Sequence, residues 1–526
     1  MYFCTILSLL KIMNDPMQYG TLNALGKSSL PIPFDRFLDD LKLRMQQVFR
    51  IRPDKEPLSS KRGIPAIVLR DIIACNPLSV SIPAAYGGRG ANPVEILAVL
   101  SAASYESLSL SLTLGINSAL FLQPVAKFGR EDIKGPIFKR FMQEHIMGGL
   151  MITEPDYGSN ALHMQTFFTD KGESFHIKGT KHWAGLTGHA SYWLLTAREQ
   201  DKRSGELKRD IEFFICDVTR PGQEIVVEEF FDNLGLYQIP YGRNRIDVQV
   251  PVAQRLEPKT TGINLLIELL NGSRFQFPGI GLGFIQRMMD EAIDHCKHRL
   301  VGGKSLFNYD QVQQRLSRLQ ASFTISSAMC AFSSDKAKTT NDLTSSGLEA
   351  NSVKTVITDL MHEAAQSLVQ LVGAKAYRYN HIGGRGIIDS RSFQIFEGSN
   401  DILYAQISER IVKLMKRAKE TNLYQFLQKF NLTENAAGSI KELLNFNLNM
   451  QLPQRKLVEL GQVIGRIISL EMVMKLGEKG FREDLINNGI EMLRKEITSL
   501  MSHFKVTDNT RIVEDYQQDS SWLEFI

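Results

Sequence analysis

The sequence predicts an α+β protein of several domains, in the order helical, β, helical and helical. Three observations support this fold class. Apolar residues recur at helical spacing from about residue 35 to about residue 147. Short strand-like segments, separated by clusters of Gly, Pro, Asp and Lys, follow to about residue 258. Helical spacing then returns to about residue 417, and again from about residue 427 to about residue 505.

These changes of pattern divide the 526 residues into five parts, and a chain of this length has room for about three or four domains. The predicted parts are an N-terminal extension (1–34), a helical domain (35–147), a β domain (148–258), a helical bundle (259–417) and a helical extension (418–526).

Composition excludes several classes of protein. The net charge of +4 comes from 61 basic and 57 acidic residues, which is too balanced to predict binding to nucleic acid. The five cysteines are scattered and form no C-x-x-C pair. This pattern is typical of free thiols in a reducing compartment and argues against a disulfide framework or a structural zinc site. We therefore expect a cytoplasmic protein, or a mitochondrial-matrix protein in a eukaryote, without a metal site.

Two apolar stretches need an assignment. Met1–Met13 lacks a basic leading segment and a cleavage site and is too short to span a bilayer, so we interpret it as a packing strand, a short helix or an extension from an early start codon. Leu108–Phe121 is rich in Ser and Leu and nearly uncharged. Because Gly115, Asn117 and Ser118 interrupt it, we predict a buried core helix and not a membrane span.

The other elements follow in order. Phe34–Met45 has helical spacing, Ile82–Gly90 is rich in turn residues, and Pro93 suits the first turn of the next helix. The β domain contains strand-like segments at 149–153, 174–178, 192–197, 212–218, 224–230 and 245–250. Strands this short and closely spaced predict a small barrel or sandwich.

The extension after residue 417 contains amphipathic stretches at 443–450, 457–468 and 490–497. We interpret the extension as a helical cap on the core.

The segment 389–404 carries the first candidate for chemistry. Glu397 directly follows Phe393, Ile395 and Phe396, and a carboxylate among apolar side chains is hard to ionise, so its pKa should rise towards the range of a general base. Gly398 allows close backbone approach to a ligand. Ser399 is a candidate N-cap for a helix that begins with Asp401 and Ile402. The alternative is a surface Glu at the start of a helix.

Two further motifs belong to the β domain. In Met151–Asn160 a strand ends at Thr153, and a loop of small polar residues offers N–H groups and hydroxyls to an anionic or heteroaromatic ligand. Downstream, Gly179 and Lys181 suit a tight hairpin turn. Trp183 just beyond is either core or a cover for a planar cofactor.

Together with two stretches of the bundle, these motifs resemble those of the acyl-CoA dehydrogenase family. The stretches that carry the resemblance are Ile152–Asn160, Gly179–Trp183, His298–Tyr309, Gln370–Ala374 and Arg391–Ser399, all in the family's order. The resemblance covers about residues 35–415. Longer family members carry a comparable helical extension, so the resemblance also implies an alternative to the cap that we favour for residues 418–526, a role in long-chain substrates, dimer formation or docking to a membrane surface. It implies a middle β-barrel, a C-terminal four-helix bundle and FAD as cofactor.

The implied reaction is α,β-dehydrogenation of an acyl thioester, carried on CoA or on a carrier protein, to the trans-2-enoyl thioester. The resemblance makes Glu397 the base, with its own backbone N–H holding the thioester carbonyl oxygen. Phe393, Ile395 and Phe396 are the candidates for keeping its carboxylate desolvated. Some family members take the base from the position before Arg274, where this chain has Ser273, which cannot serve.

The family's other roles pass to matching positions. For the cofactor, the resemblance implies that Thr153 hydrogen-bonds the flavin ring and that Trp183 covers one of its faces. It implies that Arg299 meets the pyrophosphate and that Gln370 and Gly373 line the adenine end from a neighbouring subunit. Ser399 and Asp401 would flank the flavin. For the substrate, the implied residues are Ser159 at the entry of the pantetheine arm, Asn271, Arg274 near the thioester, and Gly398.

The chain departs from the family pattern in several places. Gly302 replaces a Phe, Ala374-Lys375-Ala376 replaces a glycine-rich stretch, Gly185 replaces a Ser or Thr near the flavin, and Asn160 replaces an Asp. The expected partners are an electron-transfer flavoprotein and further copies of the chain, as a homodimer or homotetramer. Two alternatives stay open: an oxidase of the same fold that passes electrons to oxygen, and a relative that has lost FAD and catalysis.

Overall fold

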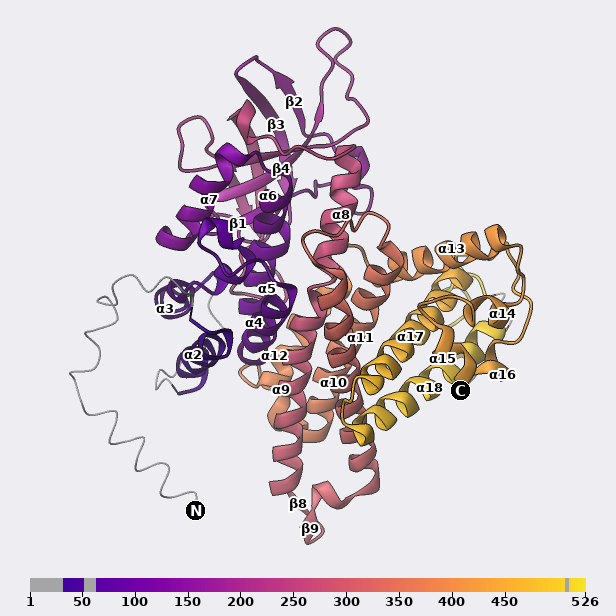
Figure 1. Ribbon diagram of the computed structural model, residues 1–526. Coiled ribbons are helices and arrows are strands. Elements are labelled where there is room, and N and C mark those ends of the chain that lie inside the picture. The colour runs from indigo at the N-terminus through magenta and orange to yellow at the C-terminus, as the bar shows by residue number, and fades with distance from the viewer. Residues whose placement is uncertain (1–31, 52–62, 507–509) are drawn as a thin grey trace, which may run out of the picture.

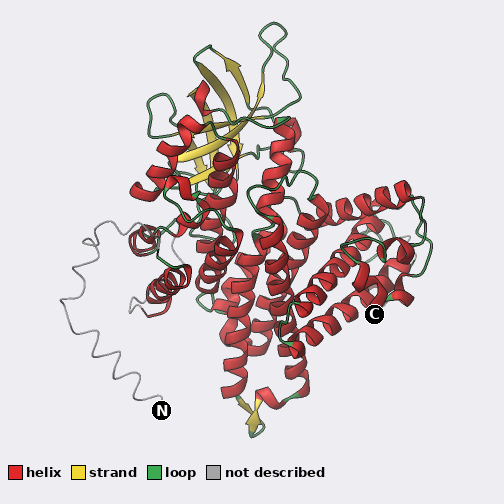
Figure 2. Ribbon diagram, in the orientation of Figure 1, coloured by secondary structure: helices red, strands yellow, loops and turns green. Residues whose placement is uncertain are grey.

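The computed structural model describes residues 32–51, 63–506 and 510–526, so the apolar segment Met1–Met13 lies outside the described residues. The predicted order of helical, β, helical and helical regions is confirmed (Figure 1). The strands of the middle domain gather at one end of the molecule, and helices make up nearly all of the rest (Figure 2). Thr153 and Trp183 belong to the domain of the sheet, and Glu397 belongs to the helical region.

The N-terminal region is helical as predicted. Its helices are α2 (Phe34–Gln46), α3 (Ala66–Asp71), α4 (Pro93–Glu106), α5 (Leu108–Asn117), α6 (Gln123–Phe128) and α7 (Glu131–Glu144). Helix α4 begins at Pro93 because the Asn92 side chain accepts a hydrogen bond from the Val94 N–H at 3.0 Å and proline suits the first turn.

The apolar stretch that begins at Leu108 is a core helix. Through a π-helical turn it continues into α6, and Leu108–Phe128 is the one helical stretch of the described chain that is long and apolar enough to cross a membrane. Of its most apolar window, 89% is buried inside the protein. The buried Asn117 accepts a hydrogen bond from the Gly148 N–H at 2.7 Å and so joins this helix to the first strand. The prediction of a buried helix is confirmed.

The middle domain is a curled seven-stranded sheet. Its strands are β1 (Gly148–Met151), β2 (Phe167–Asp170), β3 (Ser174–His182), β4 (Tyr192–Glu199), β5 (Glu212–Asp217), β6 (Val226–Phe230) and β7 (Gly242–Pro251). The order is β1-β4-β2-β3-β7-β6, with β5 also paired to β4. The pairs that β4 makes with β1 and β2 are parallel and the others are antiparallel. Strand β2 was not predicted, because it has only four residues and the last of them, Asp170, belongs to a cluster of turn residues.

The tight turn predicted at Gly179 and Lys181 is wrong, because β3 runs straight through both residues. A side chain at 179 would overlap Thr166, so this glycine permits close packing inside the sheet. Lys181 is fully buried and paired with Glu154. Glycine and lysine are common in surface turns, but here Gly179 allows close packing against Thr166 and Lys181 forms a buried ion pair.

The C-terminal region is a bundle of long helices. It consists of α8 (Gly262–Arg274), α9 (Phe277–His298), α10 (Asp310–Lys336), α11 (Gly347–Val372), α12 (Ile382–Arg391) and α13 (Asn400–Ala418). A hairpin of β8 (Leu300–Val301) and β9 (Lys304–Ser305) joins α9 to α10 at the end of the bundle remote from the sheet (Figure 1). Its two-residue turn needs glycine, because Gly302 and Gly303 have φ of +56° and +79°.

The extension packs on the bundle as further helices. They are α14 (Leu423–Leu427), α15 (Glu434–Ser439), α16 (Lys441–Leu444), α17 (Gln454–Glu478) and α18 (Glu483–Lys505). The helical predictions at 457–468 and 490–497 are confirmed, and that at 443–450 is wrong. Helix α16 ends at Leu444, and the backbone of Phe446 and Leu448 pairs instead with Leu423 and Thr421.

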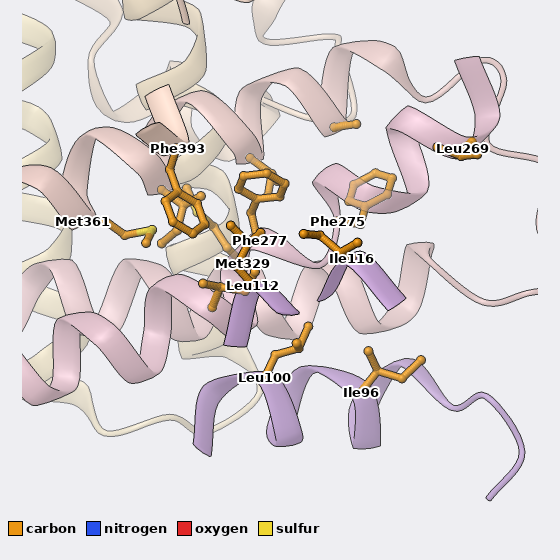
Figure 3. Packing of buried hydrophobic residues seen from close by; sticks show 14 of the residues in the cluster. Ile96, Leu100, Leu112, Ile116, Leu269, Phe275, Phe277, Met329, Met361 and Phe393 are labelled. Carbon is orange, nitrogen blue, oxygen red and sulfur yellow. The ribbon is translucent and has the colours of Figure 1, made fainter. Parts of the chain in front are cut away.

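The apolar core is continuous across the junction of the domains. Side chains of α4 and α5, such as Leu100 and Ile116, pack towards Phe275 and Phe277 where α8 passes into α9, with Phe393 close by (Figure 3). The segment that carries Glu397 therefore rests on the core and not on a mobile surface.

Candidate active site

Glu397 lies in a short turn between the 3-10 helix Ser392–Gln394 and α13. Its φ is +55°, a left-handed conformation that side chains other than glycine seldom adopt, and Gly398 follows with φ of +93°. Ser399 occupies the predicted N-cap position, but α13 starts at Asn400 and the Ser399 side chain makes no capping hydrogen bond. Other contacts must therefore hold this turn.

The carboxylate of Glu397 has one engaged and one unengaged oxygen. Oε1 accepts a hydrogen bond from the Ser273 hydroxyl at 2.7 Å. Oε2 is buried and has no hydrogen-bond partner among the described residues. Burial raises the pKa of Glu397, against the Ser273 hydrogen bond and the positive charges of Arg274 and Lys354, which lower it. This is the environment of a general base, as the sequence predicted.

Aromatic residues that precede Glu397 in the chain pack together on Phe277. The rings of Phe393 and Phe396 lie 4.9 Å apart, and both pack against Phe277 at 5.9 and 6.0 Å. The third predicted shield, Ile395, is 57% exposed, so that part of the prediction is wrong. The Phe393 ring, two residues earlier, is wholly buried.

Two buried cations hold the backbone of the turn. Arg274 donates from Nη2 to the Glu397 carbonyl at 2.7 Å, and Lys354 donates from Nζ to the Gly398 carbonyl at 2.9 Å. Lys354 also donates to Asn400 Oδ1 at 2.9 Å, and burial lowers its pKa to about 7. The sequence analysis missed Lys354. The sequence feature that could have identified Lys354 is its position as a single lysine among the apolar residues of the long helix α11.

The predicted substrate contacts of α8 lie in the interior. Asn271 is 1% exposed and its amide donates to the Leu343 carbonyl at 2.8 Å. Arg274 is also buried, and its Nη1 donates to Asn351 at 2.8 Å. In this structure both residues support the turn and the neighbouring loop, and Gly398 lies between Arg274 and Leu403.

Trp183 stands at the end of β3 with φ of +54° and 52% of its surface exposed. Its ring packs on Phe231 at 4.6 Å and on Tyr241 at 6.1 Å. Burial raises the pKa of Tyr241, and the negative charge of Glu397 raises it further, so this tyrosine lies near the carboxylate. Of the two interpretations of Trp183, the open face favours a cover for a planar ligand over a core residue.

The loop that carries Thr153 is fixed beside Trp183. The His182 N–H donates to the Thr153 carbonyl at 2.8 Å. The next residue, Glu154, pairs with Lys181 at 3.0 Å and accepts the N–H groups of Gln165 and Thr166. This buried ion pair links the Thr153 motif to the Gly179–Trp183 motif, which the sequence analysis treated separately.

The end of this loop and the start of α13 are open to solvent. Ser159, Asn160 and Asp401 are exposed, and Ser399 is half-buried. At Gly185, in contrast, a Cβ would stand 2.9 Å from Ile116 and 3.4 Å from Tyr241. The space of the hydroxyl that this chain lacks is therefore occupied by its own side chains.

The remaining predicted cofactor residues lie elsewhere. Arg299 is exposed at the end of α9, and Gln370 and Gly373 are exposed at the end of α11. The positive charges of Lys375 and Arg299 both lower the pKa of His295, after the larger effect of burial, so the two helix ends are neighbours. We call Arg299, Gln370 and Gly373 the bundle-end group.

We call Thr153, Trp183 and Glu397 the sheet-side group. Figure 1 places the β8–β9 hairpin, next to Arg299, at the far end of the bundle from the sheet. One chain therefore carries the predicted cofactor residues as two separate groups. The sheet-side group contains the half-exposed Trp183 and the buried carboxylate oxygen of Glu397, and the three residues of the bundle-end group are exposed.

Three family models match the chain in order. They are described as the acyl-CoA dehydrogenase N-terminal domain, matched by residues 49–144, the middle domain, matched by 149–248, and the C-terminal domain, matched by 260–412. A curated relative, an acyl-CoA dehydrogenase of Bacillus subtilis, is 24% identical over 69% of this chain and 94% of its own length.

Solved structures share the fold. Butyryl-CoA dehydrogenase from Megasphaera elsdenii superposes with a TM-score of 0.64 at 20% identity, over 74% of this chain and all of that one. An acyl-CoA dehydrogenase from Bacillus anthracis, complexed with FAD, reaches a TM-score of 0.70 at 16% identity, over 92% of this chain and 93% of that one. The chain belongs to the acyl-CoA dehydrogenase family, a family of oxidoreductases that act on CH–CH groups.

Proposed function

We propose that the protein catalyses the FAD-dependent α,β-dehydrogenation of an acyl thioester, most simply an acyl-CoA, with Glu397 as the base. The observation that carries the proposal is the unengaged oxygen Oε2 of Glu397, which is buried. A buried carboxylate oxygen without a partner is unfavourable for folding, and such a group is a candidate for a chemical task.

In the proposed reaction the substrate loses two hydrogens and gains a carbon–carbon double bond. Glu397 Oε2 takes the proton from the α-carbon. FAD, when bound, supplies the acceptor for the hydride that leaves the β-carbon. The α-proton is weakly acidic, so the thioester carbonyl must be polarised by a donor. The backbone N–H of Glu397 makes no hydrogen bond to the described residues and is the donor that we assign.

The chain's own contacts support this assignment of the donor. Arg274 holds the Glu397 carbonyl and Lys354 holds that of Gly398, so the two peptide groups that directly follow the Glu397 N–H are fixed. A donor that is already oriented stabilises developing charge without reorganisation during the reaction. The rings of Phe277, Phe393 and Phe396 pack together at the start of the same turn.

We propose that FAD is shared between two copies of the chain. Thr153 and Trp183 of one copy would hold the flavin, with Ser159, Ser399 and Asp401 at its margin. Arg299, Gln370 and Gly373 of the other copy would hold the pyrophosphate and adenine, where the Arg299 guanidinium suits paired phosphate oxygens. The separation of the two groups on one chain supports a homodimer or a tetramer built from such dimers.

The base is tested with Glu397→Gln, which keeps the shape and removes the proton acceptor. The variant should purify yellow with FAD, and thioester should reduce its flavin about 10²–10⁴ times more slowly than in the wild type. Stopped-flow bleaching of flavin absorbance under anaerobic conditions measures this. Glu409→Gln, an exposed carboxylate on the same helix α13, is the matched control and should bleach normally.

Rapid bleaching of Glu397→Gln would refute the assignment of the base. A wild-type protein that purifies colourless and takes up no added FAD would refute the cofactor. We propose electron-transfer flavoprotein as the acceptor of the electrons, and hydrogen peroxide formed in step with turnover would instead identify an oxidase. A panel of thioesters on CoA and on carrier protein, in the same assay, identifies the acyl group.

A further inference from the structure

We infer that Arg466, in the C-terminal extension, positions the catalytic turn: it holds Asp359, and Asp359 holds the two residues that flank Glu397. The inference rests on the proposed role of Glu397. It gives the extension a task in the reaction, beyond covering the bundle.

Asp359, on α11, accepts hydrogen bonds from both sides of the catalytic turn. Its Oδ1 accepts from Gln394 Nε2 at 2.8 Å and from Asn400 Nδ2 at 2.8 Å. Gln394 precedes Glu397 by three residues and Asn400 follows it by three. One carboxylate therefore ties together the entry and the exit of a turn whose central residue has a strained left-handed backbone.

The second oxygen of Asp359 faces the extension. Oδ2 accepts the Tyr404 hydroxyl at 2.6 Å and the Nη2 of Arg466 at 3.1 Å. Arg466 also donates to the Tyr404 hydroxyl from Nη1 and to Glu496, on α18, at 3.4 Å. The Arg466 side chain is 11% exposed and that of Asp359 is 23% exposed. Among the described residues, the other side chains that donate to this carboxylate are neutral, so Arg466 supplies its counter-charge.

The packing of α17 explains how Arg466 reaches this point. A Cβ at Gly461 would overlap the Tyr404 carbonyl, and one at Gly465 would stand 3.3 Å from Val356 and 3.5 Å from the Tyr404 ring. The two glycines lie one helical turn apart and let α17 approach both α13 and α11 closely (Figure 1). A helix that served only as a cover would not need this approach opposite the first turn of α13.

Loss of Arg466 should disturb Glu397 through Asp359. A partly buried carboxylate without its cation is unfavourable, so Asp359 would move towards water or take up a proton. Either change alters its hold on Gln394 and Asn400. A small displacement of a catalytic group lowers the rate of the chemical step, whereas the affinity for the thioester also depends on contacts outside the turn. The expected result is a fall in kcat with little change in KM.

The test uses the FAD-loaded, full-length protein and the most active thioester of the panel. Arg466→Met should lower kcat by about tenfold and change KM by less than about twofold, with normal FAD content. Arg466→Lys keeps the charge and loses the forked contact, and should recover part of the loss.

The matched control is Glu471→Gln, on the same helix. Glu471 is buried and accepts the N–H groups of Asn435 and Ala436 at 2.9 and 2.8 Å, within the extension. Both variants should lower the Tm, and only Arg466→Met should lower kcat. Equal losses of kcat in the two variants would show that the extension acts through stability alone, which would overturn the inference.

A double-variant cycle keeps the test decisive if Arg466→Met folds poorly. If Arg466 acts through Asp359, replacing Arg466 in an Asp359→Asn protein should change kcat by less than about twofold, because the charge it serves is gone. Independent, multiplicative losses would overturn the inference. Failure of the proposed function is a separate outcome, because then Glu397→Gln would bleach at the wild-type rate whatever Arg466 does.

Discussion

At Glu397 opposing influences set the ionisation of one carboxylate. Burial raises its pKa, whereas the Ser273 hydroxyl and two neighbouring cations lower it. Ser273 stands at the position where the family resemblance implies the base of some members, and here its hydroxyl donates to the Glu397 carboxylate.

Ser273→Ala tests this balance. Removing the hydroxyl removes a bond that favours the ionised carboxylate, so the pKa of Glu397 should rise further. The base acts when ionised, so the rate of flavin reduction rises with pH through this pKa, and in the variant that limb should shift to higher pH. Stopped-flow rates between about pH 5 and 9 measure the shift. An unchanged or acid-shifted limb would contradict it, and Ser408→Ala, on α13, should show no shift.

The sequence predicted Glu397 as the candidate base, but it did not predict the residues whose hydrogen bonds hold its turn. Glu397 stands in a stretch whose aromatic neighbours are consecutive in the chain. Lys354 and Asp359 are distant in sequence, and each reaches the turn only because α11 packs beside α13. A lone lysine on the apolar face of a helix indicates a buried charge, but no local pattern shows which turn it reaches.

Among the elements, β3 shows why two motifs occur together. Glu154 and Lys181 form a buried ion pair that fixes the Thr153 loop to the end of the strand that presents Trp183. A buried pair of this kind is weak as a source of stability, but removal of one partner leaves the other without compensation.

Lys181→Met should therefore lower the free energy of unfolding by about 3–5 kcal/mol, because it leaves Glu154 charged and buried. Adding Glu154→Gln should recover part of this loss. Denaturation by urea, followed by far-UV circular dichroism, measures both. Lys178→Met, at a half-exposed position of the same strand, is the control and should change stability by less than about 1 kcal/mol. A similar small effect of Lys181→Met would contradict the account.

The helix wrongly predicted at 443–450 shows how one sequence pattern fits two kinds of secondary structure. Leu444, Phe446, Leu448 and Met450 alternate with polar residues, which is the period of a strand, and the backbone there pairs with residues 421–423. A stretch this short supports both periods, and the choice depends on which neighbour is present.

For the whole molecule, the decisive feature is the separation of the sheet-side and bundle-end groups. If FAD is shared between copies, two defective chains can complement each other. In a dimer of Glu397→Gln with Arg299→Ala, one site carries both defects and the other carries neither. Random assembly during co-expression should therefore restore about a quarter of the wild-type activity.

Dehydrogenase assays on the co-expressed, tagged mixture test this prediction. The matched control pairs Glu397→Gln with Trp183→Ala. Both changes lie in the sheet-side group, so every mixed dimer has two defective sites and no activity should return. No recovery in the first pair would mean that each site is formed by one chain. Recovery in the control would mean that Glu397 and Trp183 do not serve the same site.

The sequence by itself determined the order of the regions, the buried helix that begins at Leu108, the family and the candidate for the base, because each depends on residues that are close together in the chain. Only the tertiary structure decided what surrounds that base. It placed Ser273, Lys354 and Asp359 against one turn, joined Glu154 to Lys181, and brought Arg466 to the site. Hydrogen bonds and ion pairs between distant segments depend on how helices and strands pack, and no local pattern records that packing.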